Sequence, residues 1–479
     1  MATTYPNLIN GRTVDSTDRN TDINPSNTSD VVGEFARATT VELDQAIAAA
    51  REAFRKWSRS TPQERFDILD RAATEILARK DELGRMLSRE QGKQLADGIG
   101  EAARAGYIFK FFAGEALRLT GEKVDSVRHG IEVDVTREPI GVVAAITPWN
   151  FPLAIPAWKI APALAYGNCV VFKPAELVPA SPWAIADIVQ RAGLPPGVLN
   201  LVMGPGSKLG AALASAPGID AVSFTGSRDV GPGVALAATK AGARVQLEMG
   251  GKNPLVVLDD ADLNVAVALA VNGAFFQAGQ RCTASSRIIV TDAIHDKFVA
   301  AMVERTKKLV IDDALKPGTE IGPVVDERQL AKNFEYVEIG KKEGAKLAYG
   351  GERLKRDTEG FYMSPAIFTD TMQQMRINQE EVFCPVAAII RVHNYDEAIA
   401  VANETPFGLS AGIVTTSLKY ASHFKRNSES GLVMVNLPTA GLDYHVPFGG
   451  RKASSYGPRE QGSYAREFYT IVKTAYTQA

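Results

Sequence analysis

The sequence predicts an α/β protein in which helices cover two largely parallel sheets. The first observation is a series of short apolar runs, separated by helical segments at the spacing of βαβ units. These runs lie at 142–146, 169–172, 199–203 and 221–224. The second observation is another series of apolar runs, which predicts a second sheet. Its members lie at 253–258, 287–290, 386–392 and 412–415. A composition of 45% hydrophobic and 23% charged residues is typical of a globular chain.

The N-terminal part is predicted to be mostly helical after a polar start. Residues 1–35 are rich in turn signals. Thr39 can cap a helix whose apolar positions follow at helical spacing, and Pro62 opens a second helix. A third helix is expected at about 100–117.

Two further strands are predicted. Residues 130–136 alternate apolar and polar side chains, as a half-buried strand does. Residues 467–477 combine β-branched and aromatic side chains, which also favour a strand. The length of 479 residues suggests two or three domains, at roughly 100–200 residues for each.

Charge balance and cysteine count exclude several classes of protein. With 53 Lys and Arg against 55 Asp and Glu, the net charge is −2. This balance gives no basic surface for nucleic acid or for an anionic membrane. Three cysteines in 479 residues cannot form a disulfide framework, which predicts a cytoplasmic protein.

One segment has the length of a membrane span. Residues 141–172 carry a single charge, Lys159. Prolines interrupt the segment at nearly every helical turn, so no single helix should survive. They are Pro148, Pro152, Pro156 and Pro162. The N-terminus has no basic region followed by an apolar core, so neither a secretory signal nor a membrane partner is expected. We interpret the segment as the buried centre of an α/β domain.

Glycines between strand and helix indicate a nucleotide site. The run 199–203 precedes Gly204, Gly206 and Gly210 and then an alanine-rich helix. Glycines there let the backbone approach phosphate at a helix N-terminus. The spacing is one residue longer than the dinucleotide fingerprint, so a simple tight turn is an alternative. A second junction of this kind at 222–227 strengthens the prediction of a dinucleotide.

Lys173 and Glu176 follow the end of a predicted buried strand. In Rossmann-like sheets this is where the ligand binds. A carboxylate there can accept hydrogen bonds from ribose hydroxyls, and it would repel a 2′-phosphate. The alternative interpretation is a pair of solvated loop charges.

Cys282 is the candidate nucleophile. Arg281 precedes it, and a neighbouring cation should lower the thiol pKa and increase the thiolate. Cys169 and Cys384 lie in apolar settings that are typical of inert core cysteines. The five histidines lie far from these motifs in sequence, which disfavours a Cys–His protease. A structural role for Cys282 is the alternative.

Glu248 and Asn150 could complete such a site. Glu248 lies between apolar residues, and its burial would raise the carboxyl pKa toward the range of a general base. The alternative is an ion pair with Lys252. Asn150 lies in a proline-fixed loop, where its amide could donate to a developing oxyanion. A turn-forming asparagine is the alternative there.

Eight motifs, in this order, resemble those of the NAD(P)-dependent aldehyde dehydrogenase superfamily, and the resemblance covers essentially the whole chain. They are TPWNFP at 147–152, KPAE at 173–176, FTGS at 224–227, LEMGGKNP at 247–254, GQRC at 279–282, EEVFCPV at 380–386, PFGL at 406–409 and PFGGRKASS at 447–455. The resemblance implies that Cys282 attacks an aldehyde, with the Asn150 amide and the Cys282 backbone N–H holding the oxyanion. It further implies that Glu248 activates the water that releases the acid, and that Lys159 lies close to the proton pathway.

The resemblance also implies NAD as the cofactor, with NADP possible, and no metal. Glu176 favours NAD, because NADP-preferring relatives often carry a small residue at that position. The expected cofactor-binding residues are Thr147, Pro148, Trp149, Lys173, Glu176, Gly206, Gly210, Phe224, Thr225, Gly226, Ser227, Gly250, Glu381 and Phe383.

The expected substrate is a small oxo-acid semialdehyde, such as 2,5-dioxopentanoate or succinate semialdehyde. An aromatic or aliphatic aldehyde is the alternative, because Trp158 and Phe276 occupy positions where many ω-oxo-acid relatives carry arginines. Arg281 and Arg287 are candidate partners for a substrate carboxylate. The expected substrate residues are Phe151, Trp158, Phe276, Arg281 and Phe448.

The chain departs from the family pattern at its C-terminal motifs. Cys384 and Ser455 each replace a usual glycine, and Pro458 resembles an insertion. Glu460 matches a second glutamate that takes part in proton relay in some relatives. An acyl-CoA-forming relative would lack the base Glu248, and a catalytically silent binding protein would need none of the catalytic set, so both functions are disfavoured.

The resemblance implies three structural parts. A Rossmann-like dinucleotide-binding domain is expected at 1–118 and 141–249, and an α/β catalytic domain at 250–463. A small β oligomerisation arm is expected at 119–140 and 464–479. Exposed edge strands of this kind need a partner, so a homodimer or homotetramer is expected.

Overall fold

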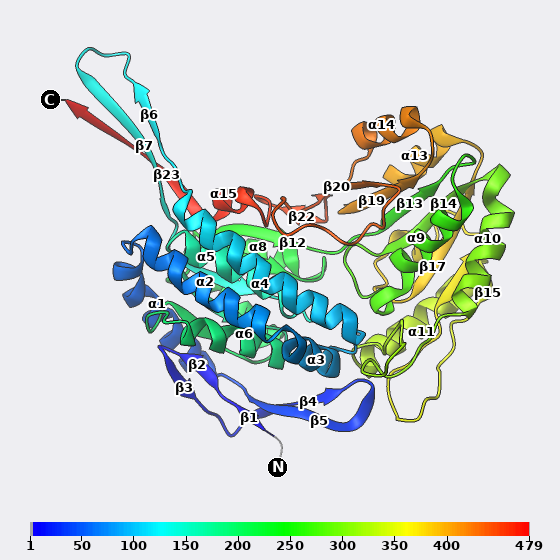
Figure 1. The fold of residues 1–479 in the computed structure, drawn as a ribbon, viewed down its shortest axis with the longest axis horizontal. Coiled ribbons are helices and arrows are strands. Elements are labelled where there is room, and N and C mark those ends of the chain that lie inside the picture. Colours follow the sequence, from blue (N-terminus) through cyan, green and yellow to red (C-terminus); the bar gives the residue numbers. More distant parts are fainter. Residues whose placement is uncertain (1–2, 479) are drawn as a thin grey trace.

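The computed structural model describes residues 3–478 and shows two lobes, each built on one large sheet (Figure 1). The first sheet has eight strands in the order β22-β12-β11-β8-β9-β10-β2-β3. Its five central strands are parallel, and β22, β2 and β3 add antiparallel edges. The strands are β2 (Asn7–Ile9), β3 (Arg12–Val14), β8 (Val142–Ile146), β9 (Cys169–Lys173), β10 (Leu199–Leu201), β11 (Ala221–Thr225), β12 (Arg244–Glu248) and β22 (Ser455–Tyr456). Both β8 and β9 are buried along their whole length, as central parallel strands are.

The second sheet has seven strands in the order β15-β16-β17-β14-β13-β19-β20. Only the edge strand β15 runs antiparallel to its neighbour. The strands are β13 (Asn253–Val257), β14 (Ser285–Thr291), β15 (Lys346–Tyr349), β16 (Ala366–Thr369), β17 (Val386–Val392), β19 (Ser410–Val414) and β20 (Leu432–Val435). The predicted α/β class with parallel sheets is therefore confirmed.

Helices cover both sheets, and the buried apolar side chains gather separately in each lobe. The first lobe holds α1 (Thr40–Trp57), α2 (Pro62–Ala78), α3 (Lys80–Gln91), α4 (Leu95–Leu117), α5 (Ala154–Ala165), α6 (Ala180–Arg191), α7 (Ala211–Ser215), α8 (Gly231–Lys240) and α15 (Arg466–Tyr469). The second holds α9 (Leu263–Phe275), α10 (Asp292–Lys307), α11 (Glu327–Lys342), α12 (Arg376–Gln379), α13 (Tyr395–Asn403) and α14 (Leu418–Asn427).

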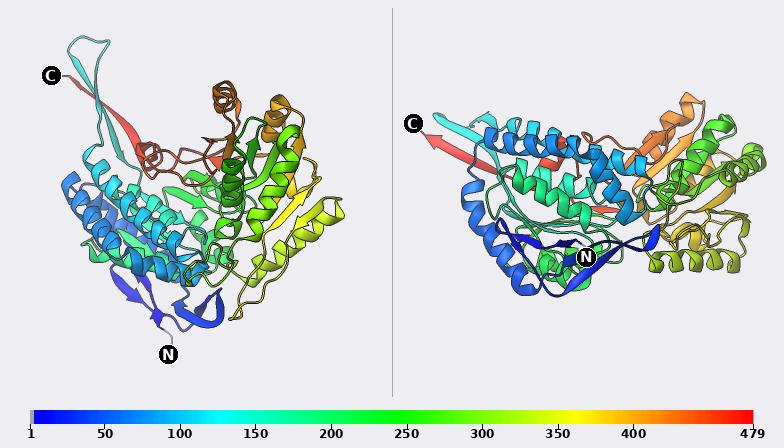
Figure 2. Two further views of the ribbon diagram at one scale, coloured as in Figure 1. Left: turned by 45° about the vertical axis from the view of Figure 1, so that its right-hand side comes forward. Right: turned by 60° about the horizontal axis from the view of Figure 1, so that its bottom comes forward.

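A three-stranded antiparallel ribbon projects from the first lobe in all three ribbon views (Figures 1 and 2). It consists of β6 (Glu122–Asp125), β7 (Ile131–Pro139) and the C-terminal β23 (Thr470–Gln478), in the order β23-β7-β6. The two smaller sheets pair β1 (Thr4–Tyr5) and β4 (Arg19–Asn24) with β5 (Asn27–Ala36), and β18 (Phe407–Gly408) with β21 (Arg451–Lys452).

Helix starts follow their predicted caps, whereas two features of the N-terminal part differ from expectation. Thr39 forms a capping box at α1, and Pro62 is the first residue of α2. The polar residues 1–35, however, contribute five strands, which form no apolar runs: β1 and β4 pair with β5, β2 pairs with β3, and β2 also pairs with the distant β10. The helix α3 was not predicted either, although Leu83, Met86 and Leu87 follow helical spacing in it.

The segment 141–172 contains a helix after all. The helix α5 includes both Pro156 and Pro162, and every one of its residues is buried. Pro156 lies in the first turn of the helix, where backbone N–H groups have no partner within the helix, so its missing N–H costs no hydrogen bond. Only Pro162 lies inside the helix. Within residues 3–478, no helix has both the length and the apolar character needed to cross a membrane.

Two glycines bring α3 and α4 into direct backbone contact. A Cβ atom on Gly84 would lie 2.5 Å from Cα of Ile99, and one on Gly98 would lie 2.5 Å from the carbonyl oxygen of Gly84. Neither neighbouring atom is on a flexible side chain. The close approach fixes α4, which carries two side chains that are important for the site described below.

We predict that Gly84→Ala destabilises the protein by about 1–3 kcal/mol, because the added methyl group forces the two helices apart. Gly100→Ala, on the same helix α4, is the control, since a Cβ there meets nothing within 4 Å. Chemical denaturation should place Gly84→Ala below the wild type and Gly100→Ala at or slightly above it. Equal midpoints for both variants would contradict the packing argument.

Candidate active site

Two cavities meet at Cys282, and this residue lines both of them. The first has a volume of about 420 Å³ and lies over the carboxyl ends of β8, β9 and β11. The second has a volume of about 380 Å³ and lies between α4, α5 and the loop 438–442. The ends of parallel strands are the usual ligand site of such sheets, so the first cavity suits a large ligand.

The loop before Cys282 has an unusual backbone. Three successive residues, Gln277, Ala278 and Gly279, have φ values of 56°, 53° and 66°. Such strain persists only where the surroundings impose it, and it is typical of functional sites. Gly279 is also required for space, since a Cβ there would lie 2.2 Å from the carbonyl oxygen of Cys384.

Asn253 holds the loop from the other side. Its Nδ2 donates to the carbonyl oxygens of Cys282 at 2.7 Å and Ala284 at 3.0 Å. Its Oδ1 accepts from the N–H of Ser410. Sequence reasoning did not single out Asn253, although it lies in the predicted motif at 247–254.

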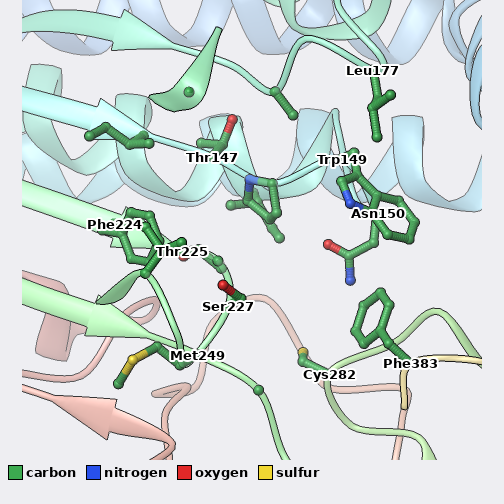
Figure 3. Close-up of a pocket in the computed structure, with 18 of the residues that line it drawn as sticks. Thr147, Trp149, Asn150, Leu177, Phe224, Thr225, Ser227, Met249, Cys282 and Phe383 are labelled. Carbon is green, nitrogen blue, oxygen red and sulfur yellow. The ribbon is translucent and has the colours of Figure 1, made fainter. Parts of the chain in front are cut away.

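Asn150 reaches the first cavity from the loop after β8. Figure 3 shows its amide and the Cys282 thiol on facing sides of this cavity, with the Phe383 ring beside them. One amide hydrogen of Nδ2 donates to the carbonyl oxygen of Gln280 at 3.2 Å. The second hydrogen is available to an oxygen bound near Cys282, which is the arrangement that an oxyanion hole requires.

A buried ion pair holds the loop that carries Asn150. Lys93 donates to Glu101 at 2.5 Å and to the backbone oxygen of Asn150 at 2.9 Å. Glu101 in turn accepts from the N–H groups of Leu153 at 2.9 Å and Ala154 at 3.1 Å. The Lys93 ammonium also lies 3.8 Å from the centre of the Phe151 ring. No sequence pattern pointed to this pair, because its members act through the backbone of a distant loop.

Glu248, at the end of β12, is buried and lines neither cavity. Its Oε2 accepts a 2.6 Å hydrogen bond from the Ser455 hydroxyl. Burial and, to a smaller extent, the Glu460 carboxylate raise its pKa well above the usual value, and the Ser455 hydrogen bond opposes this rise. The departure noted at Ser455 therefore places a hydroxyl directly on the predicted base.

Lys159 lies close to that carboxylate group. Its ammonium pairs with Glu460 and donates to the Ser223 hydroxyl at 2.8 Å. Ser223 continues the chain of contacts to Gln246 at 2.9 Å. Lys159, Glu460 and Glu248 are all buried, so these polar side chains form one network beneath the cavities.

The environment of the Cys282 thiol differs from the one predicted. Burial, with smaller effects of Glu381 and Glu248, raises its pKa to about 12. Arg281 does not offset this rise, since burial dominates and its side chain donates to the carbonyl oxygens of Asn272 and Gly273. The expectation that Arg281 activates the thiol is therefore wrong, and a base is needed to remove the proton.

The first cavity has the polar groups that a dinucleotide needs. Thr147 Oγ1, Thr225 Oγ1 and Glu176 Oε2 are buried and have no hydrogen-bond partner within residues 3–478. Lys173 is buried as well, which lowers its pKa to about 8. A Cβ on Gly206 would lie 3.6 Å from its Nζ, so the glycine leaves this ammonium accessible. Ribose and phosphate oxygens can satisfy these groups, and the residues therefore fit the cofactor.

Most of the predicted cofactor residues lie in this lining. Only Gly210 is outside it, in the turn that follows Gly206. The cavity also includes three residues of α11 that the sequence did not indicate, Arg328, Gln329 and Lys332. No pattern within α11 distinguishes them from an ordinary solvated helix face.

The second cavity has an aromatic wall. Phe151, Trp158 and Phe448 line it, as does Arg281, and the Trp158 and Phe448 rings stack 5.4 Å apart. Phe276 is not part of this lining. It packs instead against the core of the second lobe, because the left-handed residues after it turn the chain away.

The polar groups of the second cavity also differ from expectation. Arg287 is fully buried and gives its donors to protein acceptors, among them the carbonyl oxygens of Lys252 and Ala402, so it cannot meet a substrate. Arg104, which sequence reasoning missed, lines the cavity from α4. It could have been found only by placing the 95–117 helix beside the cysteine loop.

Cys384 replaces glycine without strain. The left-handed conformation falls on Phe383, at φ 62°, and Cys384 is absent from the positive-φ residues of the described chain. Burial raises the pKa of its thiol to about 12, as it also does for Cys169. Among residues 3–478, no group of three His, Cys, Asp or Glu side chains has the arrangement of a metal site.

Comparison with known proteins agrees with this geometry. The profile of the aldehyde dehydrogenase family matches residues 13–475. The alpha-ketoglutaric semialdehyde dehydrogenase of Bacillus subtilis is 43% identical, over 99% of this chain and 98% of its own. The alpha-ketoglutarate semialdehyde dehydrogenase of Haloferax volcanii is 45% identical, over 98% of both chains. The crystal structure of betaine aldehyde dehydrogenase from Staphylococcus aureus in complex with NAD+ superposes with a TM-score of 0.96 at 35% identity, over 99% of this chain and 95% of that one.

We predict that Lys93→Met destabilises the protein by about 3–5 kcal/mol, because it leaves the Glu101 carboxylate buried without its cation. The double variant Lys93→Met/Glu101→Leu should recover much of that loss, since both charges are then removed. Its turnover should stay low, because the loop with Asn150 has lost its anchor. Thermal unfolding and turnover, measured on both variants, separate the two effects, and full turnover in the double variant would contradict the anchoring role.

Proposed function

The chain belongs to the aldehyde dehydrogenase family, and from that premise we propose that it oxidises an aldehyde to a carboxylic acid through a thioester on Cys282, with NAD as the cofactor. The observation that carries this proposal is the position of Cys282 between the two cavities. One cavity fits a dinucleotide and the other a small aldehyde. The thiol is the one nucleophile that both ligands can reach among the residues lining the cavities.

The first role of the protein is to hold the tetrahedral adduct. The Cys282 sulfur attacks the aldehyde carbon, and the new oxyanion accepts from Asn150 Nδ2 and the Cys282 backbone N–H. Both donors are neutral hydrogen-bond donors. Their hydrogen bonds strengthen as negative charge develops on the substrate oxygen during attack, so they stabilise the adduct more than the free aldehyde. The chemistry that NAD supplies when bound is acceptance of the hydride that this adduct loses as it becomes a thioester.

Glu248 has two tasks that need a raised pKa. It accepts the thiol proton, and it later activates the water that hydrolyses the thioester. Its side chain must rotate from Ser455 toward the cavities to do so, because its carboxylate faces Ser455 in this structure. Lys159 and Glu460 lie where the proton can leave toward the interior network.

NAD rather than NADP is supported by Glu176. Its unpartnered Oε2 lines the first cavity and would repel a 2′-phosphate, whereas it can accept from a ribose hydroxyl. The residues that we propose to hold the cofactor are those of the lining predicted from the sequence, without Gly210.

The proposed substrate is a small oxo-acid semialdehyde. Its support is the substrate printed in the names of two relatives that match over nearly the whole chain, together with a cation on the cavity wall. The aromatic wall favours a second candidate, a neutral aromatic aldehyde. Rates of NADH formation with 2,5-dioxopentanoate, succinate semialdehyde, benzaldehyde and pentanal decide between them.

The parts of the fold take their roles from this scheme. We propose residues 1–118 and 141–249 as the dinucleotide-binding domain and 250–463 as the catalytic domain. The ribbon at 119–140 and 464–479 is proposed to pair copies of the chain into a homodimer or homotetramer, because Ile471, Val472 and Tyr476 are exposed on its strand β23. A cytoplasmic location is proposed because the described cysteines, all free, suit a reducing compartment.

We predict that Cys282→Ala lowers the rate of NADH formation by more than about 10³-fold, because it removes the covalent intermediate. Cys169→Ala is the control, since Cys169 lies buried in β9 and contacts neither cavity. It should keep most of the activity with some loss of stability. Acid trapping followed by mass spectrometry should find the acyl group on the peptide with residue 282. Substantial NADH formation by Cys282→Ala would refute the mechanism.

A second prediction concerns pH. Removing the Ser455 hydroxyl by Ser455→Ala takes away a hydrogen bond that lowers the pKa of Glu248, so this pKa should rise further. Because Glu248 acts as the carboxylate, the acidic limb of the kcat profile should move to higher pH. Ser454→Ala is the matched control, since that hydroxyl accepts from the N–H of Gly408 instead. A limb that stays in place or moves to lower pH would contradict the contact.

A further inference from the structure

Two arginines line the second cavity, and their surroundings differ. Arg281 donates to the carbonyl oxygens of Asn272 and Gly273, which lie near the C-terminal end of α9. The carbonyl oxygens at a helix C-terminus carry partial negative charge, so they balance much of the positive charge on this guanidinium. Arg281 therefore has structural partners for its terminal nitrogen, although its Nε is buried without a partner in the described chain, as the Nε of Arg104 is.

Arg104 has only neutral partners. Its terminal nitrogens donate to the carbonyl oxygen of Leu442 and, at 3.2 Å, to the side-chain oxygen of Gln461. Its Nε is buried without a hydrogen-bond partner in the described chain. Among residues 3–478 it forms no salt bridge, and the two carboxylates that influence it, Glu101 and Asp443, act from beyond ion-pair distance.

The nearby acidic residues do not form an ion pair with Arg104. Asp443 follows Leu442, whose carbonyl oxygen accepts from Arg104, and its carboxylate acts on the guanidinium only through space. Glu101, one turn earlier on α4, is already bonded to Lys93 and to two backbone N–H groups. Asp97 lies seven residues before Arg104, about 10 Å along the helix axis. A half-buried guanidinium that lines a cavity without an ion-pair partner can take its anion from a ligand.

The position of Arg104 suits an extended substrate. It lies on the aromatic side of the cavity, with its guanidinium carbon 6.0 Å from the centre of the Trp158 ring. Cys282 lies at the end of the same cavity. A ligand that reaches both residues has an aldehyde at one end, a short apolar chain between the aromatic rings, and an anion at the other end.

We infer that Arg104 binds the carboxylate of an ω-oxo-acid substrate while its aldehyde reaches Cys282, and so determines the preference for acidic over neutral aldehydes. This inference rests on the proposed function and deepens it. The terminal N–H groups of the guanidinium that face the cavity donate to the carboxylate oxygens. Leu442 and Gln461 hold the guanidinium in place through neutral oxygens, so they leave its positive charge available to the substrate carboxylate.

The test compares acidic and neutral aldehydes in the variant Arg104→Met. For 2,5-dioxopentanoate and succinate semialdehyde, KM should rise roughly 10- to 100-fold, the loss expected for hydrogen bonds to a charged group. For pentanal, KM should change less than about 3-fold, and kcat should change little for every substrate. Arg104→Lys should give an intermediate KM for the acids, because it keeps the charge but loses the planar fork.

Lys110→Met is the matched control. It removes a cation from the same helix, but Lys110 pairs with Asp70 at the surface and lines neither cavity. Its kinetics should equal those of the wild type. A second readout needs no turnover of an oxo acid: succinate and 2-oxoglutarate should inhibit pentanal oxidation competitively in the wild type and about 10-fold or more weakly in Arg104→Met.

Several outcomes would overturn the inference. Arg104→Met with an unchanged preference for acids excludes Arg104, and a loss of preference in Arg281→Met alone assigns the carboxylate to Arg281 instead. An equal loss for acidic and neutral aldehydes makes Arg104 merely structural. If the wild type oxidises only neutral aldehydes and dicarboxylates do not inhibit it, the proposed substrate class is wrong. If the wild type prefers acidic aldehydes and Arg104→Met keeps that preference, the substrate class stands and another residue binds the carboxylate.

Discussion

The buried ion pair between Lys93 and Glu101 is the contact on which the geometry of the site depends. Lys93 lies in the turn after α3 and Glu101 lies on α4. Together they bind the backbone of Asn150, Leu153 and Ala154, between β8 and the start of α5. Removal of either charge leaves the other buried and unpaired, so replacement of one residue alone is costly. The close packing of α3 on α4, which requires glycines, therefore determines through this loop where Asn150 lies relative to Cys282.

Burial controls the chemistry of the site more than any neighbouring charge does. The Cys282 thiol and the Glu248 carboxyl both have raised pKa values because both are taken out of water. A protonated thiol is a poor nucleophile, whereas a carboxylate with a raised pKa is a better base. The two shifts act in opposite directions on proton transfer from sulfur to Glu248, since the raised thiol pKa hinders it and the raised carboxyl pKa favours it. Ser455 opposes that rise and thereby moderates the base.

The sequence predicted the elements whose signals are local. The cap at Thr39, the helix start at Pro62 and the buried strands β8 and β9 lie where the capping signals and the apolar runs predicted them. Among the N-terminal strands, β2 was missed because it joins the large sheet by pairing with β10, almost 200 residues away, and β3 and β4 because their residues are largely polar. The helix α5 was missed because burial on all sides compensates for an internal proline that would break an isolated helix.

By itself the sequence determined the reacting groups, because Cys282, Glu248 and Asn150 stand in motifs whose order is specific to one family. Only the tertiary structure decided how those groups are surrounded. Arg281 lies beside Cys282 in sequence and yet turns to the end of α9, whereas Arg104, almost 180 residues away, lines the cavity that ends at the thiol. The physical reason is that a charge acts through its distance and direction in space, and these follow from packing rather than from sequence order.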